Sequence, residues 1–185
     1  MTTPVTPLQN DRIQVRLIDT MDAQQLLALE TRNREFFQQF TGARDESYYT
    51  LAGQEHIIQT RMERAEQDQG YWCVIVHLET EQIIGYIMLT EVVRNHLQSC
   101  WIGYFLDASY NGQGIMTDAV QMTVQYAFEH LHFHRLEAGV MPHNKSSIRV
   151  LEKSGFEREG LARKNVKING VWQDHVTLGI VNPND

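Results

Sequence analysis

Residues 104–120 read YFLDASYNGQGIMTDAV. An apolar, strand-like segment ends within this stretch, and an amphipathic, helix-like segment begins a few residues later. Between them lie Asn111, Gly112, Gln113 and Gly114. Glycines lack a Cβ atom and let the backbone approach an anion closely, and the first amides of a helix have no partner within the helix. The stretch therefore predicts a strand, a phosphate-binding loop and a helix N-terminus, in that order.

Apolar periodicity on both sides of this loop predicts the remaining elements. Strands are expected at 13–18, 71–79, 82–94, 99–108, 135–141, 156–168 and 171–181. Helices are expected at 21–40, 51–67, 114–131 and 144–155. Short polar connections predict antiparallel hairpins, the last around Asn169-Gly170, whereas the strand–helix–strand unit in the middle requires one parallel pair. We expect one α+β domain over residues 1–185, with a mixed, mostly antiparallel sheet of about seven strands and about four helices.

Composition and charge exclude several classes of protein. The chain of 185 residues is 42% apolar and 21% charged, which is typical of a globular domain. Its net charge is −7 and it has no stripe of lysine or arginine, so a nucleic acid is not expected as a ligand. The longest apolar run, 71–78, is too short to span a bilayer, and the polar residues 1–12 contain no signal-peptide core. We expect a cytoplasmic protein that binds no membrane.

Three kinds of phosphate-binding loop compete for residues 111–117. A P-loop requires Gly-x-x-x-x-Gly-Lys followed by Ser or Thr, and no such sequence occurs in the chain. A dinucleotide fingerprint requires a third glycine where Thr117 stands, and it opens the first strand–helix unit of its domain. Glu137 lies about 20 residues farther on, where that motif has a ribose-binding acid, but it falls near the start of its strand. The remaining interpretation is a loop for the pyrophosphate of coenzyme A.

The chain resembles a known family at several places at once. The stretch 104–120 is followed, 27 residues after Thr117, by Asn144 in MPHNKSSIRVLEKSGFEREG. These motifs resemble the GCN5-related N-acetyltransferases, the GNAT superfamily. From Gly103 to Val176, the segments GQGIMT, HRLEAGVMPHNKSS, LEKSGFEREG and INGVWQDHV are similar to the Rim-type ribosomal-protein-alanine N-acetyltransferases. The joint match of loop, asparagine and LEKSGF at these spacings is specific, and the expected order of elements is that of the family.

The sequence departs from the wider superfamily pattern at several positions. The superfamily loop is usually [QR]xxGx[GA], whereas this chain has Asn111 first and Met116 last. Most members carry a tyrosine seven residues after the asparagine, as general acid toward the departing thiolate, and Leu151 stands there. The Rim branch instead has a serine three residues after the asparagine, which is Ser147 here. A glutamate of some Rim enzymes aligns near Val166, so the resemblance supplies no general base.

The resemblance implies direct attack of an amine on the thioester of acetyl-CoA in a ternary complex, with the coenzyme A thiolate as leaving group. The N-terminal α-amine of a protein, in particular a ribosomal protein, is the expected acceptor. Its reference pKa of about 7.7–8.0, against about 10.4 for lysine, leaves more neutral amine at pH 7 and suits a site without a strong base. The alternatives are an acetyltransferase for a small-molecule amine and a non-catalytic coenzyme A-binding regulatory domain. The oligomeric state is open, with a homodimer as one candidate.

The resemblance also implies roles for individual residues. Amides of the loop would bind pyrophosphate, the strand edge would pair with the pantetheine arm, and Asn144 would bond the pantetheine amide. The expected cofactor-binding residues are Tyr104, Phe105, Leu106, Gly112, Gln113, Gly114, Ile115, Met116, Thr117 and Asn144. Ser147 would orient or protonate the thiolate, with a capping or surface serine as the alternative. Glu137 is the best acidic candidate for a base, with a structural carboxylate as the alternative.

No metal is expected. The alternating histidines of HLHFH (130–134) straddle a helix end and a strand start without a carboxylate or thiol close by, which favours structural roles. Cys73 and Cys100 lie in apolar segments without metal-ligand spacing and are expected to be buried thiols. Asp174 and His175, near the chain end, are candidates for the border of the acceptor channel.

Overall fold

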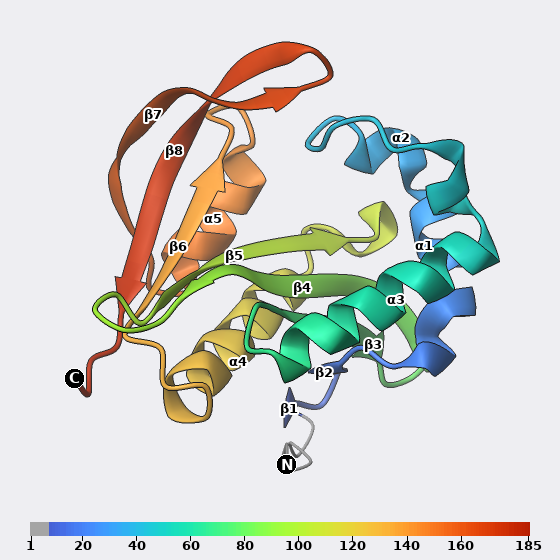
Figure 1. Ribbon diagram of the computed structural model, residues 1–185, viewed down its shortest axis with the longest axis horizontal. Coiled ribbons are helices and arrows are strands. Elements are labelled where there is room, and N and C mark those ends of the chain that lie inside the picture. The colour runs from blue at the N-terminus through green and yellow to red at the C-terminus, as the bar shows by residue number, and fades with distance from the viewer. Residues whose placement is uncertain (1–7) are drawn as a thin grey trace.

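One mixed sheet of eight strands forms the centre of the computed structural model, which describes residues 8–185 (Figure 1). The strands follow the order β1-β2-β3-β4-β5-β6-β8-β7 across the sheet. Their bounds are β1 (Leu8–Gln9), β2 (Ile13–Leu17), β3 (Tyr71–His77), β4 (Gln82–Val93), β5 (Ser99–Leu106), β6 (Arg135–Val140), β7 (Glu157–Ile168) and β8 (Val171–Val181). The first seven residues of the N-terminus, for which the sequence predicts no signal peptide, lie outside the described residues.

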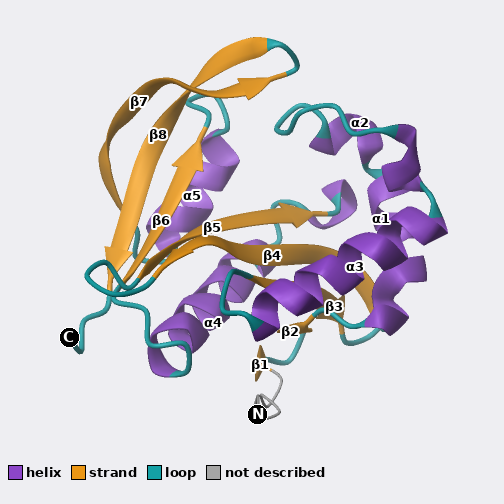
Figure 2. Ribbon diagram, viewed as in Figure 1, coloured by secondary structure: helices purple, strands orange, loops and turns teal. Residues whose placement is uncertain are grey.

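Helices cover both faces of the sheet (Figure 2). They are α1 (Ala23–Arg32), α2 (Arg34–Phe37), α3 (Leu51–Glu66), α4 (Ile115–Glu129) and α5 (Lys145–Lys153). Alternate side chains of a strand point to opposite faces, so β3 contributes to two cores. Cys73 and Ile75 pack with residues of α4 and α5, whereas Trp72 and Val74 pack with residues of α1 and α3. Cys73 and Cys100 are buried, unpaired thiols, as expected.

The expected fold class is confirmed, and one strand was not anticipated. All strand pairs are antiparallel except β5–β6, which is the parallel pair that the central strand–helix–strand unit requires. The eighth strand, β1, pairs with β2 through Leu8 and Gln9 alone, and two residues are too few for a periodic pattern. No helix within residues 8–185 has the length and apolar character needed to cross a membrane.

The single helix predicted at 21–40 is two helices in the structure, because Asn33 interrupts it. Asn33 is buried, and its Nδ2 donates to the Leu29 carbonyl at 3.0 Å. Its Oδ1 accepts a hydrogen bond from the Ala108 amide at 3.0 Å, just before the glycine loop. Asparagine side chains that bond the backbone compete with regular helix hydrogen bonds, so the chain turns here. Residues 8–185 therefore contain five α-helices where about four were expected.

The two central strands, β5 and β6, separate partway along their length. Their parallel pairing places Ser99–Trp101 beside Arg135–Glu137 and goes no farther. Next to Trp101, the pairing of β4 with β5 shifts register between Thr90 and Val93. A register shift of this kind is a β-bulge, and a β-bulge bends its strand. Beyond Trp101, the edge of β5 that faces β6 is free of strand pairing. The separation opens a space between the two strands at the centre of the sheet.

Candidate active site

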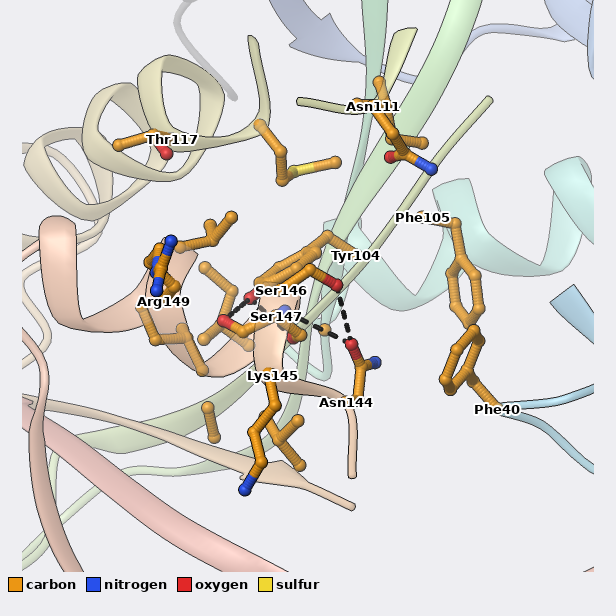
Figure 3. Close-up of a pocket in the computed structure, with 18 of the residues that line it drawn as sticks. Phe40, Tyr104, Phe105, Asn111, Thr117, Asn144, Lys145, Ser146, Ser147 and Arg149 are labelled. Carbon is orange, nitrogen blue, oxygen red and sulfur yellow. Dashed lines mark hydrogen bonds between the residues drawn. The ribbon is translucent and has the colours of Figure 1, made fainter. Parts of the chain in front are cut away.

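A cleft of about 850 Å³ lies where β5 and β6 separate. Its walls come from β5, the glycine loop, the first turn of α4, the end of β6, and α5, with α2 and β8 at one end. The predicted site residues that line it are Tyr104, Phe105, Leu106, Gly112, Gly114, Ile115, Met116, Thr117, Asn144 and Ser147. Gln113 and Glu137 lie outside the lining. Figure 3 shows Thr117 and Arg149 toward one side of the cleft, and Phe40 and Phe105 toward the other.

The glycine loop depends on two residues in the left-handed region. Gly112 has a φ of +77° and Gly114 a φ of +79°. A Cβ at Gly112 would meet nothing within 4 Å, so the backbone conformation, rather than space, requires glycine there. Gly114 is the N-cap of α4 and supplies no side-chain cap, which leaves the first amides of that helix without intrahelical partners. This arrangement suits an anion.

Arg12 holds the glycine loop from a distant part of the chain. Its Nη1 donates to the Gln113 carbonyl at 2.9 Å, and its Nη2 pairs with Asp118 at 2.6 Å. The ion pair offsets a carboxylate in the first turn of α4 that would otherwise repel an anion. The Gln113 side chain donates to the Ser109 carbonyl at 3.2 Å, within the loop. No sequence pattern pointed to Arg12, because 101 positions separate it from Gln113.

Asn144 is the N-cap of α5. Its Oδ1 accepts hydrogen bonds from the Ser147 amide at 3.2 Å and from the Ser146 hydroxyl at 3.0 Å (Figure 3). Asparagine is among the residues preferred at this position, because it satisfies amides that the helix leaves unpaired. Both bonds use the oxygen, so the Nδ2 donor remains available on a residue that lines the cleft.

A pair of hydroxyl groups connects the two walls of the cleft. The Tyr104 hydroxyl, from β5, lies 2.9 Å from Ser147 Oγ and 3.1 Å from the Ser147 carbonyl, on α5. Burial raises the pKa of the Tyr104 phenol, and the hydrogen bond with Ser147 lowers it by less, so the phenol stays protonated at neutral pH. Leu151, at the position where most GNAT members carry tyrosine, is fully buried in the core. A phenol therefore does reach this region, but from β5.

Glu137 occupies a structural position. It lies on the last paired rung of β5 and β6, beside Trp101. Its carboxylate pairs with Arg135 at 3.3 Å, and Arg135 also pairs with Glu159. These contacts favour the structural carboxylate that the sequence left as the alternative to a base.

Three cations on α5 line the cleft and were not singled out from the sequence. Lys145, Arg149 and Lys153 follow one another at intervals of four residues, which places them along one side of the helix. Glu152, the acid of this helix, pairs instead with Arg158 at 2.7 Å. The spacing of positive residues in KSSIRVLEK was the available signal, but a solvated helix face has the same pattern.

Aromatic rings form the end of the cleft away from Arg149 (Figure 3). Phe36, Phe37 and Phe40 line it from α2 and the following residues, and Phe105 lines it from β5. The rings of Phe37 and Phe105 lie 5.1 Å apart. Phe37 also belongs to the buried core between the sheet and α1 and α3, so its ring contributes to both the core and the cleft wall.

The tip of the β7–β8 hairpin faces the segment after α2 (Figure 1), and two hydrogen bonds join them. Asn169 Nδ2 donates to the Gln38 carbonyl at 2.9 Å, and Asn169 Oδ1 accepts from the Ala43 amide at 3.0 Å. Asn169 stands at the predicted Asn-Gly turn with a φ of +48°. We call this pair of bonds the Asn169 clasp. Its two partners, Gln38 and Ala43, lie on either side of Phe40, which lines the aromatic end of the cleft.

The structure assigns the HLHFH histidines ordinary contacts. His134 lies 2.8 Å from Asp185, and the His130 ring lies 5.4 Å from that of Tyr126. In the part of the chain that the structure describes, no group of three or more His, Cys, Asp or Glu side chains is placed to hold a metal ion.

A sheet that splits between two parallel strands, with a glycine-rich helix N-terminus at the split, defines an acyltransferase of the GNAT type. The Acetyltransferase (GNAT) domain model matches residues 12–157, and the chain belongs to this family. It is therefore an acetyltransferase.

Individual relatives cover nearly the whole chain. The "Probable N-acetyltransferase YjcK" of Bacillus subtilis is 50% identical over 178 residues, covering 96% of this chain and 98% of its own. The ribosomal protein uS5-alanine N-acetyltransferase of Escherichia coli is 32% identical over 180 residues, covering 97% and 93%. Among solved structures, the ribosomal-protein-S5-alanine acetyltransferase of Vibrio fischeri matches with a TM-score of 0.93 and 30% identity, covering 97% and 98%.

Proposed function

We propose that this chain transfers the acetyl group of acetyl-CoA to the N-terminal α-amine of a protein. One observation carries the proposal: the cleft at the split of the sheet has a cationic, amide-rich end and an uncharged aromatic end. A phosphate-bearing donor suits the first end and an acceptor suits the second, so that the two meet between β5 and β6. The names of the E. coli and V. fischeri relatives support a protein acceptor, and a ribosomal protein is the first candidate.

The donor end fits the chemistry of coenzyme A. Amides that follow Gly114, together with Arg149 and Lys153, would hold its phosphates. The unpaired edge of β5 beyond Trp101 would hydrogen-bond the amides of the pantetheine arm as an added strand does. The free Nδ2 of Asn144 would donate to a carbonyl of the same arm.

Ser147 and Tyr104 would act on the leaving sulfur. When the amine attacks the thioester carbon, the C–N bond forms and the C–S bond breaks. The nitrogen loses one proton, and the departing thiolate takes up one proton to become the thiol. Ser147 would donate a hydrogen bond to the sulfur as negative charge develops there. Tyr104 remains protonated, and when its single proton points to Ser147 Oγ and not to the Ser147 carbonyl, the serine proton is free to turn toward the sulfur. Neither hydroxyl needs to lose its proton.

Arg149 provides a test of the donor end. Replacing Arg149 with alanine is expected to weaken coenzyme A binding about 5- to 10-fold at low ionic strength, because one charge-assisted contact to phosphate is lost. The difference should shrink as salt is raised, since ions screen the contact. Titration calorimetry at two salt concentrations measures both effects.

Arg163, an exposed arginine on β7 outside the cleft lining, supplies the matched control. Arg163→Ala changes the net charge equally and should leave the affinity for coenzyme A unchanged. Equal losses in both variants would mean that only the overall charge matters.

Two observations favour an N-terminal acceptor over an internal lysine. The Asn169 clasp ties the segment that carries Phe40 to the tip of the β7–β8 hairpin, and beside this ordered wall we expect an extended chain end to enter more easily than the side chain of a folded surface. No carboxylate belongs to the cleft lining within residues 8–185, and an α-amine depends less on a strong base than a lysine amine does.

The proposed function is tested on a panel of amines. Peptides with free N-termini, the same peptides with blocked N-termini and an internal lysine, polyamines, aminoglycosides and free amino acids are compared by release of coenzyme A. Turnover of the free N-terminal peptides alone supports the proposal. Turnover only with a small amine supports an acetyltransferase for a small-molecule amine. Binding of coenzyme A without turnover on any amine supports a non-catalytic regulatory domain. The cytoplasmic location and the homodimer stay predictions.

The Asn169 clasp provides a test of acceptor choice. Asn169→Gly keeps the left-handed turn but removes both bonds to the segment after α2. We expect KM for an N-terminal peptide to rise about 3- to 10-fold, because two neutral hydrogen bonds that order the wall are lost. Relative activity on the blocked, lysine-containing peptide should rise.

Asn165→Ala, on β7 and outside the clasp, is the control variant and should leave KM unchanged. If Asn169→Gly also leaves KM and the peptide preference unchanged, the clasp has no part in acceptor selection.

A further inference from the structure

One side chain in the cleft lining has the chemistry to take up a proton from an amine. No aspartate or glutamate belongs to the lining within the described residues, and its lysines and arginine are cations. His175, on β8, is the one histidine that lines the cleft in this part of the chain. It is only 7% exposed.

The His175 ring is oriented so that one nitrogen is a proton acceptor. Its Nδ1 lies 3.3 Å from the backbone carbonyl of Gln173. A carbonyl oxygen can only accept a hydrogen bond, so Nδ1 carries the proton in this contact. In the neutral ring Nε2 then has a free lone pair, and within residues 8–185 it has no hydrogen-bond partner.

His175 lies on the acceptor face of the split sheet. Leu178 of the same strand packs in the core with residues of α5, and positions 175 and 178 point to opposite faces. The Tyr104–Ser147 pair belongs to the α5 face, whereas Phe105 packs with the core of α1 and α3 on the other face. The ring therefore lies across the sheet from the hydroxyl pair, on the side of the aromatic wall.

The absence of a side chain at Gly139 leaves room for the His175 ring. A Cβ at Gly139 would lie 3.7 Å from the Cβ and Cδ2 atoms of His175, and 3.1 Å from the Trp101 ring. Because Gly139 has no side chain, the imidazole rests directly beside the end of β6. Gly139 also lines the cleft, so this place borders the space between the two strands.

We propose that His175 is the general base of the acetyl transfer, an inference that rests on the proposed function. As the amine nitrogen bonds to the thioester carbon, it becomes positively charged. Nε2 of His175 takes one proton from it, directly or through one water. The C–S bond then breaks, the sulfur leaves with the electron pair, and the proton returns to the thiol or to solvent. His175 lies on the amine side and removes the proton from the nitrogen. The Tyr104–Ser147 pair lies on the sulfur side and stabilises the leaving thiolate.

The charged side chains on the strands beside His175 pair mainly with one another. On its own face, β6 carries Glu137 and Arg135, and β7 carries Glu159, which pairs with Arg135. Directly opposite His175 on β7 is Ala162, and the segment after α2 contributes Phe40. Asp174 accepts a hydrogen bond from the Lys164 amide at 2.8 Å and points to the other face.

Kinetics test the role. His175→Gln is expected to lower kcat/KM for the N-terminal peptide at pH 7 by about 100-fold, with coenzyme A affinity changed less than about twofold. The deficit should shrink as pH rises, because the amine then reaches the cleft already neutral. The control is His134→Gln at the surface, which should retain wild-type activity. Activity within about threefold of wild type for His175→Gln would overturn the proposal.

A second measurement does not depend on the acceptor. In 15N-labelled protein, the ring correlations lost in His175→Gln identify His175, and we expect the tautomer with the proton on Nδ1. The opposite tautomer, with the proton on Nε2, would also overturn the proposal. If wild-type protein binds coenzyme A but acetylates no amine, the proposed function fails, and that result is distinct from any difference between the variants.

Discussion

Replacing Ser147 with alanine is expected to lower kcat about 10- to 100-fold while the dissociation constant for coenzyme A changes less than about twofold. The hydroxyl would contribute mainly in the transition state, when charge develops on the sulfur, and such an interaction affects kcat rather than binding. A hydrogen bond to a charged group contributes about 1.5–3 kcal/mol, which corresponds to this range of rates. Steady-state release of the thiol measures kcat, and calorimetry measures the binding.

Tyr104→Phe and the double variant separate the two hydroxyl groups. If Tyr104 acts through Ser147, the double variant is no slower than Ser147→Ala alone, because a double-mutant cycle shows coupling between groups in contact. Tyr71→Phe is the matched control, since it removes a phenol that bonds Asp68 at 2.6 Å outside the cleft lining. Independent, multiplying losses would contradict the coupling. Wild-type kcat in Ser147→Ala would leave Ser147 as a helix residue only.

Replacing Gly114 with valine is expected to weaken coenzyme A binding about 5- to 150-fold. Gly114 has a φ of +79°, and a side chain there has open space, with its nearest neighbour an Arg12 nitrogen 3.9 Å away. The cost is therefore conformational. A non-glycine residue in the left-handed region costs about 1–3 kcal/mol, and the loop would relax by turning its amides away from the anion.

Gly160→Val is the control for this substitution. Gly160 lies on β7 without a positive φ, and a Cβ there makes an ordinary contact of 3.6 Å with Thr177. Calorimetry with coenzyme A should give wild-type affinity for Gly160→Val, and thermal unfolding checks that both proteins fold. Unchanged affinity in Gly114→Val would mean that the loop is not the phosphate site.

Much of the fold was predictable because its signals are local. Seven of the strands and the helices of the central unit follow from apolar periodicity within each segment, and the Asn169-Gly170 turn follows from two adjacent residues. The helix break at Asn33 was not predictable. It depends on a hydrogen bond to Ala108, which lies 75 positions away.

The candidate site also combines residues that local sequence patterns predict with residues that only long-range contacts reveal. The sequence predicted the glycine loop from adjacent residues that set its backbone geometry, and the family resemblance added Asn144 and Ser147. Only the tertiary structure assigned Arg12 to the loop and Tyr104 to Ser147, and it placed His175, which the sequence offered as a candidate for the channel border, in the cleft lining. Left-handed turns and helix caps are set by neighbours in the chain, whereas these contacts exist because the sheet splits between β5 and β6 and brings distant strands and helices around one space.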